Sequence, residues 1–393
     1  MGISLGLVGL GAFGSAFADL FMSHPLVDRI ALCDREPERM QVFAEKPSWQ
    51  PKLSPRDLYP SLDAICGSDL DALVIITQPW LHAPQAIQAL EAGKHVYSAV
   101  PVISIPDADE ILAWCDRLVR AVETTGRHYM LGETTYYRPQ AMYCRRRARS
   151  GAFGSFVYAE GEYIHDRDGR SNLREVRRRR LASQAGQEWL AREADYRERG
   201  VLNGPMHYPT HSTSGPISVM GAHPVTVCAW GYENRTADPY FADYAFSNET
   251  ALYYMSNGAT MRICEFREIG HPEREIFRIY GTDGCFEDDA WTDNRARTPL
   301  TVEEMRDPLP PEVAEAFQQV GGDSFYGGHG GSHAYLVHEF VDAVYHDRVP
   351  AINVWEAVRY TAAGAAAHKS ALQKGAHVDV PDWGDPPKLN DIP

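Results

Sequence analysis

Several tyrosines and histidines of this sequence are residue types that can transfer protons. Tyr163 and His165 are two positions apart in the alternating segment 155–165, and Tyr208 and His211 are three positions apart. The alternation predicts a strand, in which side chains two positions apart lie on the same face. Taken singly, a strand tyrosine is more often a core residue, and a histidine a hydrogen-bonded polar residue. On one strand face, however, Tyr163 and His165 could both contact one substrate and exchange protons with it.

Other histidines suggest a metal site as an alternative. His207 and His211 are four positions apart, and His329, His333 and His338 follow later. Histidines with helical spacing can share a zinc ion, but the sequence has no His-Glu-x-x-His motif, so we expect no metal. His333 and His338 fit a helix surface or a subunit interface better. The glycines around His329 indicate a flexible loop beside the substrate.

A glycine-rich run predicts the element that binds a dinucleotide. The run Gly9–Gly14 (Gly-Leu-Gly-Ala-Phe-Gly) follows the apolar segment Ile3–Val8 and precedes the helical pattern Ala16–Met22. Its first glycine permits a tight turn, its second lets the backbone approach a pyrophosphate, and its third lets the helix pack on the strand. The helix N-terminus then faces the phosphates.

Asp34 indicates which dinucleotide is bound. It ends the second apolar run, twenty residues after the last glycine of the motif. A carboxylate there accepts hydrogen bonds from the adenosine ribose and repels a 2′-phosphate, which favours NAD over NADP. The neighbouring Arg35 would weaken that discrimination. The alternative is that Asp34 only caps the helix that begins near Pro37.

The length and the hydrophobic pattern predict two α/β domains. The chain has 393 residues, of which 44% are apolar. Short apolar runs alternate with helical patterns up to about residue 132, which predicts a doubly wound parallel sheet in a Rossmann domain, residues 1–130. Long alternating segments follow, with helices expected at 332–345 and 353–374. They predict a second α/β domain, residues 131–393, with a large, mostly antiparallel open sheet.

Charge and cysteine content exclude several classes of protein. The formal net charge of −15 disfavours binding to nucleic acid or to an anionic membrane surface. No segment has the roughly 18 consecutive apolar residues that a membrane helix needs. Seven scattered cysteines without a Cys-x-x-Cys pair fit reduced thiols, and no secretion signal is evident, so we expect a cytoplasmic protein.

The arginine-rich segment 167–199, which includes the run Arg177–Arg180, has two interpretations. A solvated helix or a mobile loop is the favoured one. The other is a binding site for a phosphate or sulfate group on the substrate.

Two further segments, Thr77–His82 and Ala89–Val96, resemble the Gfo/Idh/MocA superfamily of glucose-fructose oxidoreductases and inositol dehydrogenases. The resemblance implies a Rossmann domain, a C-terminal domain with substrate on one face of its sheet, and a homodimer or homotetramer. Dehydrogenases of the superfamily use a lysine of a Glu-Lys-Pro motif as acid and base. Here Ala99–Pro101 (Ala-Val-Pro) stands at that place, so the usual mechanism is in doubt.

The sequence also resembles a narrower branch of this superfamily, the NAD-dependent glycosidases, which include α-N-acetylgalactosaminidases. This branch accounts better for the departures from the dehydrogenase motifs. The matching segments are Pro79–Trp80, Val100–Pro101, Gly132–Glu133, Tyr163–Asp166, Tyr208–His211 and Gly328–Gly331. Three features depart from that branch: Ala99 replaces its usual Glu, and His207 and the arginine-rich segment are not expected.

The resemblance to the glycosidases implies an activity and roles for single residues. C3 of a sugar is oxidised, the C1 substituent is eliminated after loss of the C2 proton, water adds, and the ketone is reduced again. His211 would be the base for the 3-hydroxyl and Tyr163 the base for the C2 proton, with His165 and Tyr208 sharing protons or orienting the sugar. The residues expected to bind the cofactor are Gly9, Gly11, Ala12, Phe13, Gly14, Asp34, Arg35, Thr77, Trp80, His82, Pro101 and Glu133.

Two alternatives remain open for a chain that acts on a small sugar or glycoside. It could be an NAD(P)-dependent sugar or polyol dehydrogenase that lacks the usual lysine and uses His207 or Tyr163 instead. It could also be a non-catalytic protein that only binds NAD. Net NADH formation would identify the dehydrogenase, and absence of any product would identify the binding protein.

Overall fold

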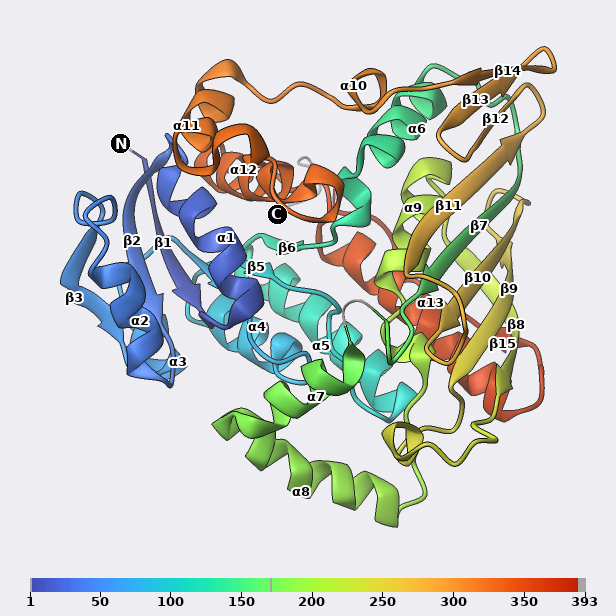
Figure 1. Cartoon of the computed structure of the whole chain (residues 1–393), viewed down its shortest axis with the longest axis horizontal. Coiled ribbons are helices and arrows are strands. Elements are labelled where there is room, and N and C mark those ends of the chain that lie inside the picture. The colour runs from blue at the N-terminus through green and yellow to red at the C-terminus, as the bar shows by residue number, and fades with distance from the viewer. Residues whose placement is uncertain (1, 170–171, 388–393) are drawn as a thin grey trace.

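The computed structural model describes residues 2–169 and 172–387, and in this part of the chain the first domain is a Rossmann fold. Six parallel strands lie in the order β3-β2-β1-β4-β5-β6 (Figure 1). The strands are β1 (Ile3–Val8), β2 (Val27–Cys33), β3 (Leu53–Tyr59), β4 (Ala72–Ile75), β5 (His95–Ser98) and β6 (Tyr129–Leu131). This order confirms the predicted doubly wound sheet.

Helices from both ends of the chain cover this sheet. Those of the first domain are α1 (Ala12–Ser23), α2 (Pro37–Ala44), α3 (Leu62–Cys66), α4 (His82–Glu91) and α5 (Ala108–Thr125). Two late helices, α11 (Pro311–Gly321) and α12 (Ser332–Tyr345), pack against α1 (Figure 1). The chain after residue 300 therefore returns to the first domain, which the sequence pattern did not indicate.

The second domain contains a nine-stranded sheet in the described residues. Its order is β14-β13-β12-β11-β7-β10-β9-β8-β15, and every neighbouring pair is antiparallel except β7 and β10. The strands are β7 (Phe156–Ile164), β8 (Pro224–Tyr232), β9 (Asn248–Met255), β10 (Thr260–Phe266), β11 (Arg274–Gly281), β12 (Gly284–Glu287), β13 (Ala290–Asp293), β14 (Ala296–Pro299) and β15 (Val378–Asp379). The prediction of a mostly antiparallel sheet is confirmed.

The helices of the second domain lie between its sheet and the Rossmann domain or extend below it (Figure 1). They are α6 (Pro139–Arg149), α7 (Leu173–Ala182), α8 (Gln184–Glu198), α9 (Thr210–Met220), α10 (Val302–Met305) and α13 (Val354–Leu372), and the short 3-10 turns are η1 (Thr135–Tyr137), η2 (Pro205–His207), η3 (Pro239–Phe241), η4 (Gly322–Ser324) and η5 (His329–Gly331). Helix α9 crosses β7 so closely that a Cβ on Gly161 would lie 1.9 Å from the Ser212 carbonyl oxygen. Only glycine permits this approach.

The register of the sheet gathers three functional side chains in one row. Tyr163 on the central strand β7 lies opposite Glu265 of β10 on one side and Glu275 of β11 on the other. Residues in register on adjacent strands point to the same face. The row therefore faces α9, which carries His211.

Two expectations about the whole chain can be compared with the described residues. No helix among them is long and apolar enough to cross a membrane. All seven cysteines are described, none forms a disulfide, and five are buried. The cysteines therefore fill space in the core.

Candidate active site

A cavity of about 950 Å³ lies between the two domains. This volume is at the upper end of the range for small-molecule sites, about 300–1,000 Å³. The four residues with predicted catalytic roles line it together: Tyr163, His165, Tyr208 and His211. The glycine-rich turn Gly9–Gly14 contributes the opposite, Rossmann side.

The glycine-rich turn has the shape that a dinucleotide requires. A Cβ on Gly9 would lie 2.3 Å from the Ile76 carbonyl oxygen, and one on Gly14 would lie 2.1 Å from the Gly9 carbonyl oxygen. Gly11, by contrast, has open space in front of it, with the nearest other atom at 3.7 Å. Gly11 is also the N-cap of α1 and offers no side-chain cap, so the first backbone N–H groups of α1 remain available for phosphate oxygens. These residues fit NAD.

Asp34 lines the cavity and is held by two backbone groups. Its Oδ2 accepts the Leu10 N–H at 2.7 Å, and its Oδ1 accepts the Glu36 N–H at 2.9 Å. A carboxylate has about four acceptor positions, so capacity for ribose hydroxyls remains. The N-cap of α2 is Glu36, so Asp34 is not simply the cap of that helix. Arg39 lies 3.7 Å from Asp34.

The other predicted cofactor residues divide into two groups. Those that line the cavity with the turn and Asp34 are Ala12, Phe13, Arg35, Thr77 and His82. Trp80, Pro101 and Glu133 lie outside the lining. Trp80 is buried and stacks on Trp189 of α8, with ring centroids 4.9 Å apart, so it anchors α8 to the Rossmann domain. His82 binds the Pro101 carbonyl oxygen through Nδ1 at 2.9 Å.

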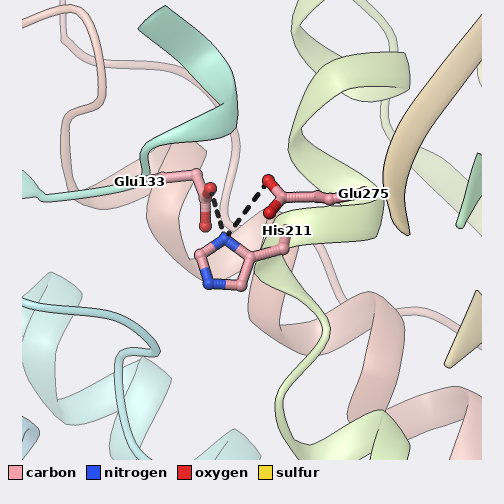
Figure 2. A group of neighbouring side chains, drawn as sticks. All are labelled: Glu133, His211 and Glu275. Carbon is pink, nitrogen blue, oxygen red and sulfur yellow. Dashed lines mark hydrogen bonds and ion pairs between the residues drawn. The ribbon is translucent and has the colours of Figure 1, made fainter. Parts of the chain in front are cut away.

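Glu133 lies behind His211 and determines its protonation. The His211 Nδ1 donates a hydrogen bond to Glu133 Oε1 at 2.9 Å and lies 3.8 Å from Glu275 Oε1 (Figure 2). Burial alone lowers the pKa of a histidine, but the two carboxylates outweigh it and raise the pKa of His211 to about 9. His211 is therefore mainly an imidazolium at neutral pH. Its Nε2 points away from both carboxylates (Figure 2).

The same three residues form a cluster that could in principle hold a metal ion. One atom from each of Glu133, His211 and Glu275 lies within 4.8 Å of the others. Glu275 pairs with Arg138 and accepts the Thr135 hydroxyl, whereas Glu133 accepts the Thr135 backbone N–H and His211 Nδ1. The protonated imidazole and the Arg138 guanidinium supply positive charge beside these carboxylates.

Tyr163 and His165 form a hydrogen-bonded pair, as the predicted strand requires. The Tyr163 hydroxyl donates to His165 Nδ1 at 2.6 Å, and the Tyr163 ring lies 4.9 Å from the His211 ring. Burial, assisted by the charge of Arg267, lowers the pKa of His165 to about 3, so this imidazole is neutral. His165 Nε2 lies 3.7 Å from Glu273 Oε1. Burial also raises the pKa of Tyr163 above its ordinary value.

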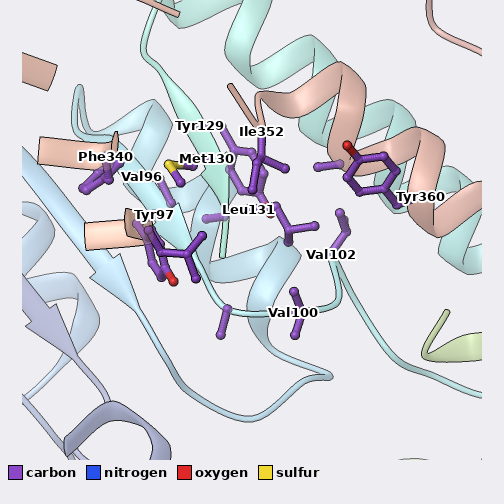
Figure 3. Close-up of a cluster of buried hydrophobic side chains, with 14 of the residues drawn as sticks. Val96, Tyr97, Val100, Val102, Tyr129, Met130, Leu131, Phe340, Ile352 and Tyr360 are labelled. Carbon is purple, nitrogen blue, oxygen red and sulfur yellow. The ribbon is translucent and has the colours of Figure 1, made fainter. Parts of the chain in front are cut away.

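The segment in place of the missing lysine closes the cavity with apolar residues. Ala99 and Val100 line it, and no lysine does so in the described part of the chain. The Tyr208 hydroxyl donates to the Val100 carbonyl oxygen at 3.3 Å. Behind this segment, Val100 and Val102 belong to a buried cluster that includes Tyr360 of α13 (Figure 3). The packing fixes the backbone next to the candidate catalytic residues.

Several residues of the site were not predicted from the sequence. Glu275 and Arg138 next to His211, and Arg267 under the Tyr163 ring at 4.7 Å, have no motif of their own. The only sequence signal for Glu275 was its place in one of the long alternating segments of the second domain. That pattern could not show that Glu275 lies opposite Tyr163, because this pairing depends on the register of β11 and β7.

Three histidines behave differently from the expectations. His207 is buried, bonds to Asn203 and does not line the cavity, so it is not placed to replace the missing lysine. His333 is also buried, and the expected place on a helix surface is wrong. Its Nε2 lies 3.0 Å from Nδ1 of His329, which does line the cavity. His338 is half-buried beside His24.

The raised pKa of His211 predicts a pH-dependent contribution to stability. Because the folded-state value of about 9 exceeds the ordinary value of 6.5, protonated His211 stabilises the folded chain fully below pH 6.5, and this contribution is lost as the pH rises through 9. The contribution is about 3 kcal/mol. We expect the melting temperature of wild type to exceed that of His211→Asn at pH 6 by more than at pH 10. An equal difference at both pH values would contradict the charge assignment.

Two protein-family models match separate parts of the chain. Residues 3–132 match the Gfo/Idh/MocA family, described as "Oxidoreductase family, NAD-binding Rossmann fold", and residues 247–386 match "Glycosyl hydrolase 109, C-terminal domain". A glycosyl hydrolase family 109 protein of Streptomyces filamentosus is 27% identical over 97% of this chain and 77% of its own length. An alpha-N-acetylgalactosaminidase of Tannerella forsythia is 25% identical over 79% of this chain and 70% of its own length.

Solved structures share the fold. The aldose-aldose oxidoreductase of Caulobacter crescentus, complexed with glycerol, superposes with a TM-score of 0.69 at 17% identity over 96% of this chain and 100% of its own. The scyllo-inositol dehydrogenase of Lactobacillus casei, with bound NAD(H) and scyllo-inositol, has a TM-score of 0.66 at 16% identity over 97% and 99% of the two chains. The chain therefore combines an NAD-binding Rossmann domain of the Gfo/Idh/MocA oxidoreductase family with a C-terminal domain of glycosyl hydrolase family 109.

Proposed function

We propose that this chain is an NAD-dependent enzyme that hydrolyses a glycoside through transient oxidation of the sugar at C3. The observation that carries the proposal is the convergence of Tyr163, His165, Tyr208 and His211 on the cavity that also contains the dinucleotide turn. The names of the relatives in glycosyl hydrolase family 109 support a glycosidase over a simple dehydrogenase.

His211 has the features of the base at the 3-hydroxyl. Glu133 holds the proton on Nδ1, so Nε2 can accept the hydroxyl proton and later return it. NAD, when bound, would supply reversible hydride transfer at C3, so that glycoside and water would give sugar and alcohol with no net change in the cofactor. Because His211 is protonated at rest, its loss of a proton precedes the oxidation.

The Tyr163–His165 pair can remove the C2 proton without forming a free phenolate. Burial makes a phenolate unfavourable at Tyr163. The Tyr163 oxygen can take the C2 proton while its own proton passes to His165 Nδ1, 2.6 Å away. Glu273, at 3.7 Å from His165 Nε2, would stabilise the resulting imidazolium. Loss of the C2 proton expels the C1 substituent, and water then adds at C1.

Asp34 supports NAD rather than NADP as the cofactor. A 2′-phosphate at the ribose would meet a buried carboxylate. Arg35, which could have offset that repulsion, is paired with Glu188 of α8 at 2.9 Å. The Arg35 charge is therefore neutralised by Glu188.

The test uses the purified protein in heavy water, without added nicotinamide, on a panel of α- and β-nitrophenyl glycosides. We expect nitrophenol release with one deuterium at C2 of the sugar, because the C2 proton exchanges with solvent during the reaction. If no glycoside of the panel releases nitrophenol, and NADH forms when free sugars and NAD are supplied, the protein is instead a dehydrogenase. Bound NAD without any product would establish the binding protein.

The outer face of the second sheet supports a homodimer or a homotetramer. Trp230, Leu252 and Tyr254 lie on neighbouring strands β8 and β9, and each is more than half exposed at 51–58%. An apolar patch of large side chains on a sheet is typical of a protein–protein contact. Light scattering on the purified chain would determine the number of subunits.

A further inference from the structure

Helix α7 forms one wall of the cavity with a single face. Leu173, Val176, Arg179 and Arg180 line the cavity, and spacings of three and four residues place them on one side of the helix. Arg177 and Arg178 lie on other sides of α7. Helix α8, which follows, is anchored to the Rossmann domain by Trp189. The position of Arg180 beside the cavity is thus held by two helices.

The arginines of α7 and α8 have carboxylate partners, with Arg180 as the exception. The paired arginines are Arg174 with Asp238, Arg177 with Glu193 and Asp243, Arg178 and Arg179 with Glu175, Arg192 with Glu110, and Arg197 with Asp243. Within residues 2–169 and 172–387, no carboxylate lies within ion-pair distance of the Arg180 guanidinium, and no hydrogen bond to it is formed.

The remaining arginines that line the cavity are also neutralised. Arg35 pairs with Glu188, Arg39 with Glu36, Arg179 with Glu175, and Arg267 with Glu265. Half-buried Arg180 therefore adds an uncompensated positive charge to the lining. A partly buried guanidinium without a counter-ion is costly, and a bound anion removes that cost.

Arg180 lines the same cavity as the candidate catalytic residues. Its charge acts on His165, Tyr208 and His82, of which the first two have proposed roles in catalysis. The adenosine end, by contrast, is marked by Asp34 and the paired Arg35. An anion at Arg180 would thus belong to a molecule that also reaches the catalytic residues.

We propose that Arg180 binds an anionic substituent of the sugar, so that the natural substrate is a glycoside carrying a carboxylate, sulfate or phosphate group. This inference rests on the proposed function, since it specifies the substrate of the same cavity. The planar guanidinium can donate two parallel hydrogen bonds to any of these groups. The other three arginines of the run Arg177–Arg180 do not take part, because they are paired with carboxylates of the protein.

The test compares Arg180→Gln with Arg178→Gln as a matched control from the same helix, whose side chain is exposed and paired with Glu175. The probes are nitrophenyl glycosides of one sugar with a hydroxymethyl, carboxylate, sulfate ester or phosphate ester group at C6. We expect wild type and Arg178→Gln to have a higher kcat/KM on one anionic probe than on the neutral one. Arg180→Gln should lose about ten- to hundred-fold on that probe and less than three-fold on the neutral one.

Two results would overturn the inference. One is a wild type that prefers the neutral glycoside over all three anionic ones. The other is an Arg180→Gln variant that loses activity equally on neutral and anionic probes, or that is purified with less NAD, because Arg180 would then serve the protein or the cofactor phosphates.

A binding measurement separates this inference from the proposed function. Calorimetry with free hexuronates, hexose 6-sulfates, hexose 6-phosphates and the parent hexoses does not depend on turnover. If no glycoside is hydrolysed but an anionic sugar binds wild type about ten-fold or more tightly than Arg180→Gln, the proposed function fails and the anion site stands. Equal binding of all sugars to both proteins would refute the anion site, whatever the activity.

Discussion

Replacing His211 by asparagine is expected to lower nitrophenol release by about a thousand-fold, with the NAD content unchanged. General acid–base catalysis contributes about 10²- to 10⁴-fold, and His211 Nε2 is the group placed to take and return the proton of the 3-hydroxyl. Asparagine can still donate a hydrogen bond to Glu133, so the buried carboxylate does not lose its partner. The loss should therefore appear in kcat and leave the fold intact.

The control for this variant is His346→Asn, a histidine-to-asparagine change at the exposed end of α12. It should leave the rate within two-fold. Single-turnover measurements of C3 oxidation should show the defect of His211→Asn directly. A loss below ten-fold would show that another group moves this proton.

Replacing Glu133 by glutamine is expected to cost about a hundred-fold or more in kcat and to move the pH profile to lower pH. In wild type the base must first lose a proton whose pKa is raised to about 9, so activity rises with pH toward that value. Without the Glu133 charge, burial lowers the pKa of His211. The rising limb of the pH profile, which is the range over which activity increases with pH, therefore shifts to lower pH. A glutamine amide can also donate to Nδ1, which places the His211 proton on Nε2 and prevents it from accepting another.

A graded comparison makes the Glu133 prediction sharper. Glu275→Gln should shift the limb in the same direction but by less, because Glu275 lies 3.8 Å from His211 Nδ1 and Glu133 lies 2.9 Å away. Glu287→Gln, at a carboxylate that bonds to Tyr280 outside the cavity, should leave the limb in place. An unchanged profile in Glu133→Gln would mean that the limb belongs to another group.

The Rossmann domain could be predicted well because its signals are local. The apolar segment Ile3–Val8, which precedes the glycine-rich run, agrees with β1 in every residue. Strand β3 (Leu53–Tyr59) was missed because Pro55, Arg56 and Asp57 interrupt its apolar pattern. It lies at the edge of the sheet, where a proline costs no ladder hydrogen bond.

The interpretation of the arginine-rich segment shows what composition cannot resolve. A solvated helix or a mobile loop was the favoured prediction, and α7 is a helix, but Arg177 is half-buried between Glu193 and Asp243. Pairing depends on which carboxylates other segments bring near. Only the structure shows that Arg180 differs from its three neighbours.

The sequence by itself determined the dinucleotide turn and the shared face of Tyr163 and His165, because glycine spacing and strand period are properties of consecutive residues. The tertiary structure decided the charge of His211. Its partners Glu133 and Glu275 come from distant segments, and their carboxylates meet the imidazole only after β11 pairs with β7 and α9 packs across both. A pKa depends on distances between charges and on burial, and neither is contained in the order of residues along the chain.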